Sequence, residues 1–212
     1  MLDRPGCFGW NTAMLLALVL IVAAYLLGSV ATAVVVCRAL GIADPREVGS
    51  GNPGATNVLR HGGKKAAAIT LLGDAGKGVV PVVAGHLLGI EPPQLTAIGA
   101  AAFAGHLFPV FYGFRGGKGV ATFVGVNFAL DWRIGACFAA AWLLVAAATR
   151  YSSLSALVAT ALTPAAAWWL GQSPAAVLLY AAMALAIFWR HRANISALAA
   201  GREKKIGEKR PA

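Results

Sequence analysis

The sequence predicts an all-α integral membrane protein, a bundle of seven transmembrane helices with its N-terminus outside the cell and its C-terminus in the cytoplasm. The first observation is the composition, with 58% hydrophobic and only 12% charged residues and a mean hydropathy of +0.70, far from an ordinary soluble domain. The second is that apolar stretches recur as far as residue 189. A secreted soluble protein with one cleaved signal peptide does not explain them. The third is the one-sided distribution of lysine and arginine.

The apolar stretches define the expected helices. A helix needs roughly 20 apolar residues to cross the hydrocarbon core of a bilayer, and seven stretches reach or approach this length. They cover residues 12–37, 66–90, 94–112, 120–130, 134–149, 154–170 and 174–189. The fourth is short, so it either extends back through the preceding glycines or is partly re-entrant.

The basic residues set the orientation. With seven spans, 15 of the 18 lysines and arginines fall on one side of the membrane, Arg4 and Arg133 fall on the other, and Lys77 lies inside a span. The positive-inside rule then places the C-terminus in the cytoplasm. Because orientation accounts for the net charge of +10, we expect a lipid bilayer and no nucleic acid as partner. Interfacial anchoring fits the tryptophans near the expected helix ends, which are Trp10, Trp132, Trp168, Trp169 and Trp189.

The chain reads as one transmembrane domain over residues 1–212, with a charged tail from about residue 201 that is too short to fold alone. Its three cysteines, Cys7, Cys37 and Cys137, lie far apart and have no paired spacing. They therefore suggest neither a disulfide framework nor a metal site.

Two polar, glycine-rich stretches interrupt the apolar pattern on the side assigned to the cytoplasm. The first, "GSGNPGATNVLR", runs from Gly49 to Arg60. Its glycines permit positive φ, so that successive backbone N–H groups can form an anion-binding concavity, and its neutral donors and guanidinium suit a phosphate. A flexible inter-helix loop with a turn at residues 52–54 is the alternative. The candidate ligand-binding residues are Ser50, Gly51, Asn52, Gly54, Asn57 and Arg60.

The second stretch, "GFRGGKGVAT", runs from Gly113 to Thr122. A helix that begins near Val120 would offer its free N–H groups and the positive end of its dipole to the same ligand. The stretch is not a Walker A loop, because the Gly-Lys pair is followed by glycine and the upstream glycine spacing is wrong. The simpler explanation of its two cations is that they set topology. The candidate residues are Arg115, Gly116, Gly117, Lys118 and Gly119.

Further polar residues lie within or at the end of the apolar segments. Asp74 and Lys77 are three residues apart inside the second span, where they can pair on one helical face. Such a pair is either a structural brace or part of a functional site, with Lys77 near enough to reach an anion. His106 precedes the second glycine stretch by about two turns. His191 and Asn194 share a face if a helix continues there.

The cytoplasmic motifs resemble those of the PlsY family, the bacterial acyl-phosphate:glycerol-3-phosphate acyltransferases. The motifs are "GSGNPGATNVLR", "GHLFPVFYGFRGGKGVAT" and "HRANISALAAGRE". The similarity extends through "YLLGS" at 25–29, "GDAGKG" at 73–78 and "RYSSLSAL" at 150–157. It therefore covers nearly the whole chain.

The resemblance implies a seven-helix enzyme of the bacterial inner membrane whose site faces the cytoplasm. It would move a fatty acyl group from acyl phosphate to the 1-hydroxyl of sn-glycerol 3-phosphate, giving lysophosphatidic acid and phosphate. By position in the motifs, the implied site contains Ser50, Arg60, Lys118, Ser153, His191, Asn194 and Glu203. Two residues depart from the family pattern: Arg115 stands where lysine is frequent, and Ala197 stands where arginine is common.

The residues favour direct attack by the acceptor hydroxyl without a covalent enzyme intermediate. Arg60 and Lys118 would clamp phosphates, and backbone N–H groups of residues 50–54 or 116–119 would stabilise the oxyanion. His191 and Asn194 would orient the acceptor, and either a phosphate oxygen or His191 would accept the proton.

Other chemistries fit less well. The His-x4-Asp pair of the better-known glycerolipid acyltransferases is missing, since His86 and Glu91 have the spacing but the wrong acid on the wrong side. No Ser/His/Asp arrangement, metal cluster or dinucleotide fingerprint is present, so we expect no cofactor. An anion transporter and a non-catalytic scaffold are the remaining alternatives. Against a transporter, the cations gather on one side and no internal repeat suggests alternating access.

Overall fold

The computed structural model describes the backbone of residues 7–208 and the side chains of residues 12–208. Arg4, Lys209 and Arg210 and the side chain of Trp10 lie outside this part of the chain. The described residues are helical and contain no strand. The helices are α1 (Cys7–Gly28), α2 (Thr32–Ala39), α3 (Ala55–Leu87), α4 (Pro92–Leu107), the 3-10 turn η1 (Val110–Tyr112), α5 (Val120–Leu130), α6 (Trp132–Thr149), α7 (Ser152–Trp169), α8 (Pro174–Arg190) and α9 (Arg192–Ala199).

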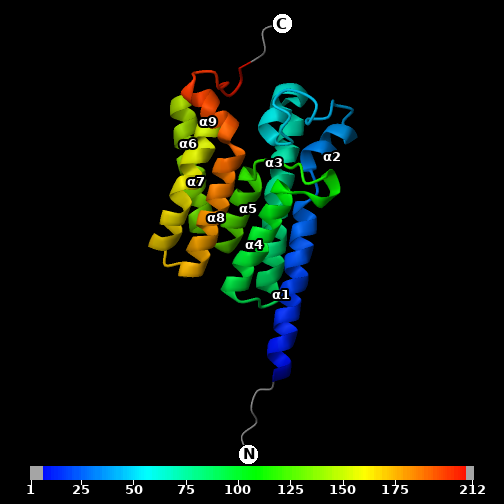
Figure 1. Cartoon of the computed structure of the whole chain (residues 1–212), viewed down its shortest axis with the longest axis vertical. Helices are drawn as coiled ribbons and strands as arrows, with labels where there is room; N and C mark the ends of the chain where they lie inside the picture. The colour runs from blue at the N-terminus through cyan, green and yellow to red at the C-terminus, as the bar shows by residue number, and fades with distance from the viewer. Residues whose placement is uncertain (1–6, 209–212) are drawn as a thin grey trace, which may run out of the picture.

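The helices run along one long axis, with α1 entering at one end and α9 at the other (Figure 1). Helix α1 packs on α4, α3 packs on α5, and α6 packs on α7. The short α5 lies in the middle, where Phe123 is fully buried and its ring centroid lies 5.8 Å from that of Phe138 and 6.3 Å from that of Tyr180. These aromatic contacts join α5 to α6 and α8 and form the centre of the core.

Glycines allow the helices to approach closely. A Cβ added at Gly28 of α1 would lie 2.1 Å from the carbonyl oxygen of Ala102, and one at Gly105 of α4 would lie 2.2 Å from that of Tyr25. Small residues at helix interfaces are typical of membrane bundles, where van der Waals packing drives association.

The helix lengths and composition are those of an integral membrane protein. Three segments of the described chain are long and apolar enough to cross a bilayer: Ala55–Leu87, Pro92–Tyr112 and Trp132–Thr149. The number rises to five if each bent pair is one span, since α1 and α2 meet at 45° and α8 and α9 at 60°. Helix α5 is apolar but only 11 residues long.

Three of the expected spans differ in detail. The first is interrupted at residues 29–31, where Ser29 donates its hydroxyl to the Tyr25 carbonyl at 2.8 Å and Ala31 leaves helical geometry with ψ 86°. The third ends at Leu107 because Pro109 forces Phe108 out of the helix.

The range expected for the second span, 66–90, begins later in the chain than the observed helix does. Helix α3 begins at Ala55, so half of the first glycine-rich stretch is helical and is not a flexible loop. A break follows at Gly63, whose φ of 79° interrupts the helix just before the apolar part. The expected bounds of 120–130 for the short fourth span are confirmed by α5.

Candidate active site

The first glycine-rich stretch is a tight turn followed by the start of α3. Asn57 is buried and holds the turn together: its Nδ2 donates to the carbonyls of Pro45 at 2.8 Å and Val48 at 3.0 Å, and its Oδ1 accepts from the Ser50 backbone at 3.1 Å. Gly49, with φ 64°, packs so close that a Cβ would lie 2.3 Å from Asn57 Oδ1. Asn57 therefore shapes the turn, and its amide is occupied by backbone partners.

The helix start beside this turn is open to a ligand. Gly54 is the cap residue of α3, and no side chain caps the first turn. The hydroxyl of Ser50 and the guanidinium of Arg60 belong to exposed residues on either side of it. Free N–H groups, the positive end of the helix dipole and a guanidinium form an arrangement that attracts phosphate. Asn52 and Gly51 border the same turn.

In the second glycine-rich stretch, Gly116, Gly117 and Gly119 are buried, whereas Gly49 and Gly51 of the first are exposed. A Cβ at Gly116 would lie 2.0 Å from the carbonyl oxygen of His106, and one at Gly117 would lie 2.2 Å from His106 Nε2. Gly119 has a φ of 86° and caps α5. Arg190, at the end of α8, donates to the carbonyls of Gly117 at 2.9 Å and of Gly116. This loop is therefore held on both sides.

A polar chain joins four of the residues that the motifs imply. Lys118 donates to Asn194 Oδ1, Asn194 Nδ2 donates to Glu203 Oε1 at 2.8 Å, and Ser153 Oγ donates to the same oxygen at 2.7 Å. The four residues come from the start of α5, from α9, from the segment after α9 and from the start of α7. The second and third motifs and the start of α7 thus meet at one end of the bundle.

Contacts also tie the first stretch to this end of the bundle. Thr56 Oγ1 lies 3.4 Å from Ser152 Oγ, next to Ser153. The guanidinium of Arg46, just before the turn, lies 5.5 Å from the centre of the Tyr112 ring, just before the second stretch. The two stretches therefore face one polar region.

The charges of this region act on one another. Burial lowers the pKa of Lys118, and the nearby charges of Arg60 and Arg190 lower it further, while Glu203 opposes the shift. Arg60, Arg190 and Glu203 thus lie near enough to Lys118 for their charges to act on it. A cluster of three cations with one carboxylate is an electrostatic setting for phosphate.

His191 lies beside the same cations as a neutral side chain. It is 3% exposed, and its Nδ1 bonds to the Ile187 carbonyl at 2.8 Å. Burial lowers the pKa of His191 to about 4, with the Ile187 bond opposing and Lys118 and Arg190 adding to the shift. At neutral pH, Nδ1 carries the proton and Nε2 is an acceptor.

A family model described as Glycerol-3-phosphate acyltransferase matches residues 18–201. The chain belongs to this acyltransferase family. It is 57% identical over 196 residues to the glycerol-3-phosphate acyltransferase of Thioalkalivibrio sulfidiphilus, covering 92% of this chain and 97% of that protein. It is 56% identical over 199 residues to the protein of the same name from Jannaschia sp., covering 93% and 96%.

Two crystal structures of PlsY (YgiH), an integral membrane glycerol 3-phosphate acyltransferase, share the fold. The glycerol 3-phosphate form has a TM-score of 0.85 at 40% identity and covers 90% of this chain and 96% of that one. The lysophosphatidic acid form has a TM-score of 0.81 at 37% identity and covers 90% and 95%. The predicted resemblance to the PlsY family is confirmed.

Some candidates in this member of the acyltransferase family stand apart from the polar chain. Arg115 is exposed, and within residues 12–208 its side chain has no hydrogen bond or ion pair. Asp74, Lys77 and His106 form a separate buried cluster below the second stretch. Sequence analysis missed Arg190, which it counted only as a charge at a helix end. Its position after a long apolar run was the only available signal.

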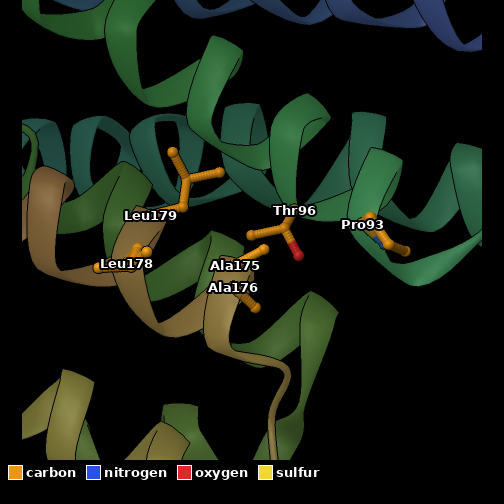
Figure 2. Close-up of a pocket in the computed structure, with 6 residues that line it drawn as sticks. All are labelled: Pro93, Thr96, Ala175, Ala176, Leu178 and Leu179. Atoms are coloured by element: carbon orange, nitrogen blue, oxygen red, sulfur yellow. The ribbon is translucent and has the colours of Figure 1, made fainter.

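A pocket between α4 and α8 lies away from this site. It is lined by Pro93, Thr96, Ala175, Ala176, Leu178 and Leu179 (Figure 2). These residues belong to the first two turns of α4 and α8, whereas the polar chain lies beyond their other ends. Within residues 12–208, no group of three or more His, Cys, Asp or Glu side chains could hold a metal ion.

Proposed function

We propose that this protein transfers a fatty acyl group from acyl phosphate to the 1-hydroxyl of glycerol 3-phosphate, giving lysophosphatidic acid and phosphate. Family membership supports the acyltransfer, and the names of the two crystal structures support the acceptor and product classes. The observation that carries the proposal is the polar chain Lys118–Asn194–Glu203–Ser153 beside Arg60 and the open start of α3. Both substrates carry phosphate, and this region concentrates cations and N–H donors.

The donor chemistry requires little covalent help from the protein. Acyl phosphate is already activated, so positioning and charge neutralisation supply most of the rate enhancement. Arg60 and Lys118 hold phosphate groups, and backbone N–H groups of residues 50–54 or 116–119 stabilise the oxyanion. The carbonyls of Gly116 and Gly117 are bound by Arg190, which keeps these acceptors from facing the developing negative charge.

The acceptor hydroxyl attacks the acyl carbon directly. Its oxygen forms the new ester bond, the bond from the acyl carbon to the phosphate oxygen breaks, and the phosphate leaves with the electron pair. Asn194 is fixed by Lys118 and Glu203 on its two sides, so it can orient the acceptor together with His191. Burial lowers the pKa of His191 to about 4, which makes it a weak base at neutral pH. This favours a phosphate oxygen as the proton acceptor.

The acyl chain lies along the apolar outer surface of the bundle and enters from the bilayer. An apolar groove between α7 and α8 supports this: it is lined by Ala161, Pro164, Ala181, Ala184, Leu185 and Phe188. Phe188 is three residues before His191, so the groove leads toward the site. Each CH₂ group that it buries contributes roughly 0.8 kcal/mol.

The protein is a single domain of seven spans in the bacterial inner membrane, with the site on the cytoplasmic side. Counting α1 with α2 as one span and adding α5, α7 and α8 to α3, α4 and α6 gives this number, and α9 then lies on the cytoplasmic side. The positive-inside count and the opposite positions of α1 and α9 (Figure 1) support an outside N-terminus. This orientation can be tested with the variants Lys65→Cys and Trp132→Cys, each made in a protein without other cysteines. In intact cells, a membrane-impermeant thiol reagent should label Trp132→Cys and should not label Lys65→Cys.

Turnover of purified protein in detergent tests the reaction. Palmitoyl phosphate and labelled glycerol 3-phosphate should give labelled lysophosphatidic acid, and palmitoyl-CoA should give none. Lys118→Ala and His191→Ala should abolish product, whereas Lys65→Ala, an exposed lysine of α3, is the matched control and should not. Product formed without a membrane gradient argues against a transporter. If neither donor gives product, the proposed reaction is wrong. If Lys118→Ala leaves product formation unchanged, the proposed site is wrong.

A further inference from the structure

A buried ion cluster lies under the second glycine-rich stretch. Asp74 Oδ1 and Lys77 Nζ are 2.9 Å apart, and their side chains are 3% and 5% exposed. Lys77 Nζ also donates to the Val30 carbonyl at 2.7 Å and to His106 Nδ1 at 3.1 Å. Two hydrogen bonds and one ion pair thus surround the ammonium group of Lys77 with partners from the protein. Lys77 is therefore held inside the protein by contacts with three of its own residues.

Charges buried inside a membrane segment are expensive and call for a role. The three partners of Lys77 belong to different parts of the fold: Asp74 to α3, Val30 to the break between α1 and α2, and His106 to α4. The cluster thus joins three elements around one ammonium group. Because the ion pair is neutral as a whole, it adds no net charge to the site above it.

His106 connects this cluster to the glycine loop. Its Nδ1 lies 3.1 Å from Lys77 Nζ and 3.6 Å from Asp74 Oδ1, and a Cβ at Gly117 would lie 2.2 Å from its Nε2. The Gly117 backbone donates to the His106 carbonyl at 3.1 Å. The loop just before Lys118 is therefore packed on both the ring and the backbone of His106.

We propose that Asp74, Lys77 and His106 are positioning residues that hold residues 116–119, and with them Lys118, in the geometry that binds substrate phosphate. Asp74 neutralises and orients Lys77, Lys77 fixes the ring of His106, and the ring fixes the loop from below. Arg190 holds the same loop from the other side. The inference rests on the proposed function for its effect on catalysis, but the loop geometry is measurable without turnover.

The decisive variant removes both charges together. Either single substitution would leave an unpaired charge in the membrane and threaten folding. The double variant Asp74→Asn/Lys77→Met keeps the side-chain sizes and buries no net charge. The matched control is Arg133→Met, which breaks the 2.7 Å ion pair with Asp131 just before α6, away from the polar chain.

Hydrogen exchange and steady-state kinetics are then compared between the purified proteins. In the double variant, backbone amides of residues 113–120 should exchange at least tenfold faster than in the wild type. The value of kcat/KM should fall at least tenfold, mainly through a raised KM, with a thermal midpoint close to that of the control. The Arg133→Met protein should match the wild type in all three measurements apart from a small shift in midpoint.

Two results would overturn the positioning role. One is loop exchange equal to the control with kcat/KM within twofold of the wild type. The other is a lower thermal midpoint with faster exchange throughout α3 and α4 and an unchanged kcat/KM, which would make the cluster a helix brace only. If the wild type gives no product from any donor, the proposed function fails, and loop exchange in the double variant still decides the positioning role.

Discussion

The two glycine-rich stretches are alike in composition and opposite in surroundings. Gly49 and Gly51 of the first are exposed and have φ angles of 64° and 67°, so there glycine supplies a backbone conformation, and at Gly49 also a close approach to Asn57. Gly116 and Gly117 of the second are buried against His106, so there glycine supplies the absence of a side chain. The first stretch offers a turn and an open helix start, and the second is a rigid support for Lys118.

The difference shows what a glycine-rich motif can mean in a membrane protein. In the first stretch, a side chain of the stretch itself, Asn57, binds the turn's carbonyls. In the second, the carbonyls are bound by Arg190 from a distant helix. The shape of the first stretch is therefore local, whereas that of the second depends on the packing of α4 and α8. The following predictions test this difference, first by a direct comparison of the two stretches and then within each of them.

The largest expected effect comes from adding a methyl group to each stretch. In Gly116→Ala the new Cβ meets the His106 carbonyl and also Pro109 Cδ, at 2.6 Å, so the loop must move and shift Lys118. A misplacement of about 1 Å can cost roughly 100-fold in rate, and kcat/KM should fall about that much. Gly51→Ala, whose Cβ would lie 3.3 Å from the Arg46 carbonyl, should lose less than about tenfold. Equal losses, measured with palmitoyl phosphate, would remove the distinction.

The next effect concerns stability at the two ends of the second stretch. Gly119 has a φ of 86°, and a Cβ there would lie 2.4 Å from Phe103 Cε2. Gly119→Ala combines backbone strain with overpacking and should cost about 2 to 4 kcal/mol. Gly113 has a φ of 60°, and a Cβ added there would have no heavy atom within 4 Å. Gly113→Ala should therefore cost only the backbone strain of about 1 to 2 kcal/mol. Thermal unfolding in detergent compares the two, and an equal loss would argue against close packing at Gly119.

A smaller effect is expected from breaking the local support of the first stretch. Asn57→Ala leaves the carbonyls of Pro45 and Val48 without the amide donor and should cost about 1 to 3 kcal/mol. Asn52→Ala is the control, because Asn52 makes no hydrogen bond through its side chain in the part of the chain that the structure describes, and its stability should stay within about 0.5 kcal/mol of the wild type. If the two variants unfold at the same temperature, the turn does not depend on Asn57.

The smallest effect is a pH dependence that comes from His191, which lies near Lys118 of the second stretch. Burial, with Lys118 and Arg190 nearby, lowers the pKa of His191 to about 4, below the ordinary value of about 6.5. Between these values the unfolded state binds a proton that the folded state does not, so stability falls as pH falls through this window and is complete above it. The loss from pH 7 to pH 5.5 should be about 1 kcal/mol.

His191→Gln isolates this contribution. Between pH 7 and pH 5.5, the unfolding free energy of this variant should fall by about 1 kcal/mol less than that of the wild type. Parallel curves for the two proteins would mean that His191 titrates alike in the folded and unfolded states.

The sequence predicted the parts of this molecule that depend on local pattern. The start of α5 follows directly from Gly119 before an apolar run, and the pairing of Asp74 with Lys77 follows from their spacing on one helix. For Lys118 and Asn194, the sequence predicted only that both lie on the same side of the membrane, and it did not predict their hydrogen bond.

What could not be predicted depends on tertiary contacts. The pair Gly28-Ser29 is the only local signal for the break between α1 and α2 in the described chain. The Val30 carbonyl at this break accepts a hydrogen bond from Lys77, 47 residues away. Arg190 reaches carbonyls 73 and 74 residues earlier in the chain. Asn57 was predicted to face a ligand because its type suits one, but its partners are the backbone of its own turn.

The position of Glu203 has a consequence for the order in which the protein is made. It follows α9 in the chain, yet it joins Ser153 at the start of α7 to Asn194. A ribosome delivers α1 to α9 first, so the helices can enter the bilayer and pack while this junction is still open. The junction can form only after Glu203 has been synthesised, which happens after all the helices of the described chain. The helices are therefore made before the last residue of the polar chain.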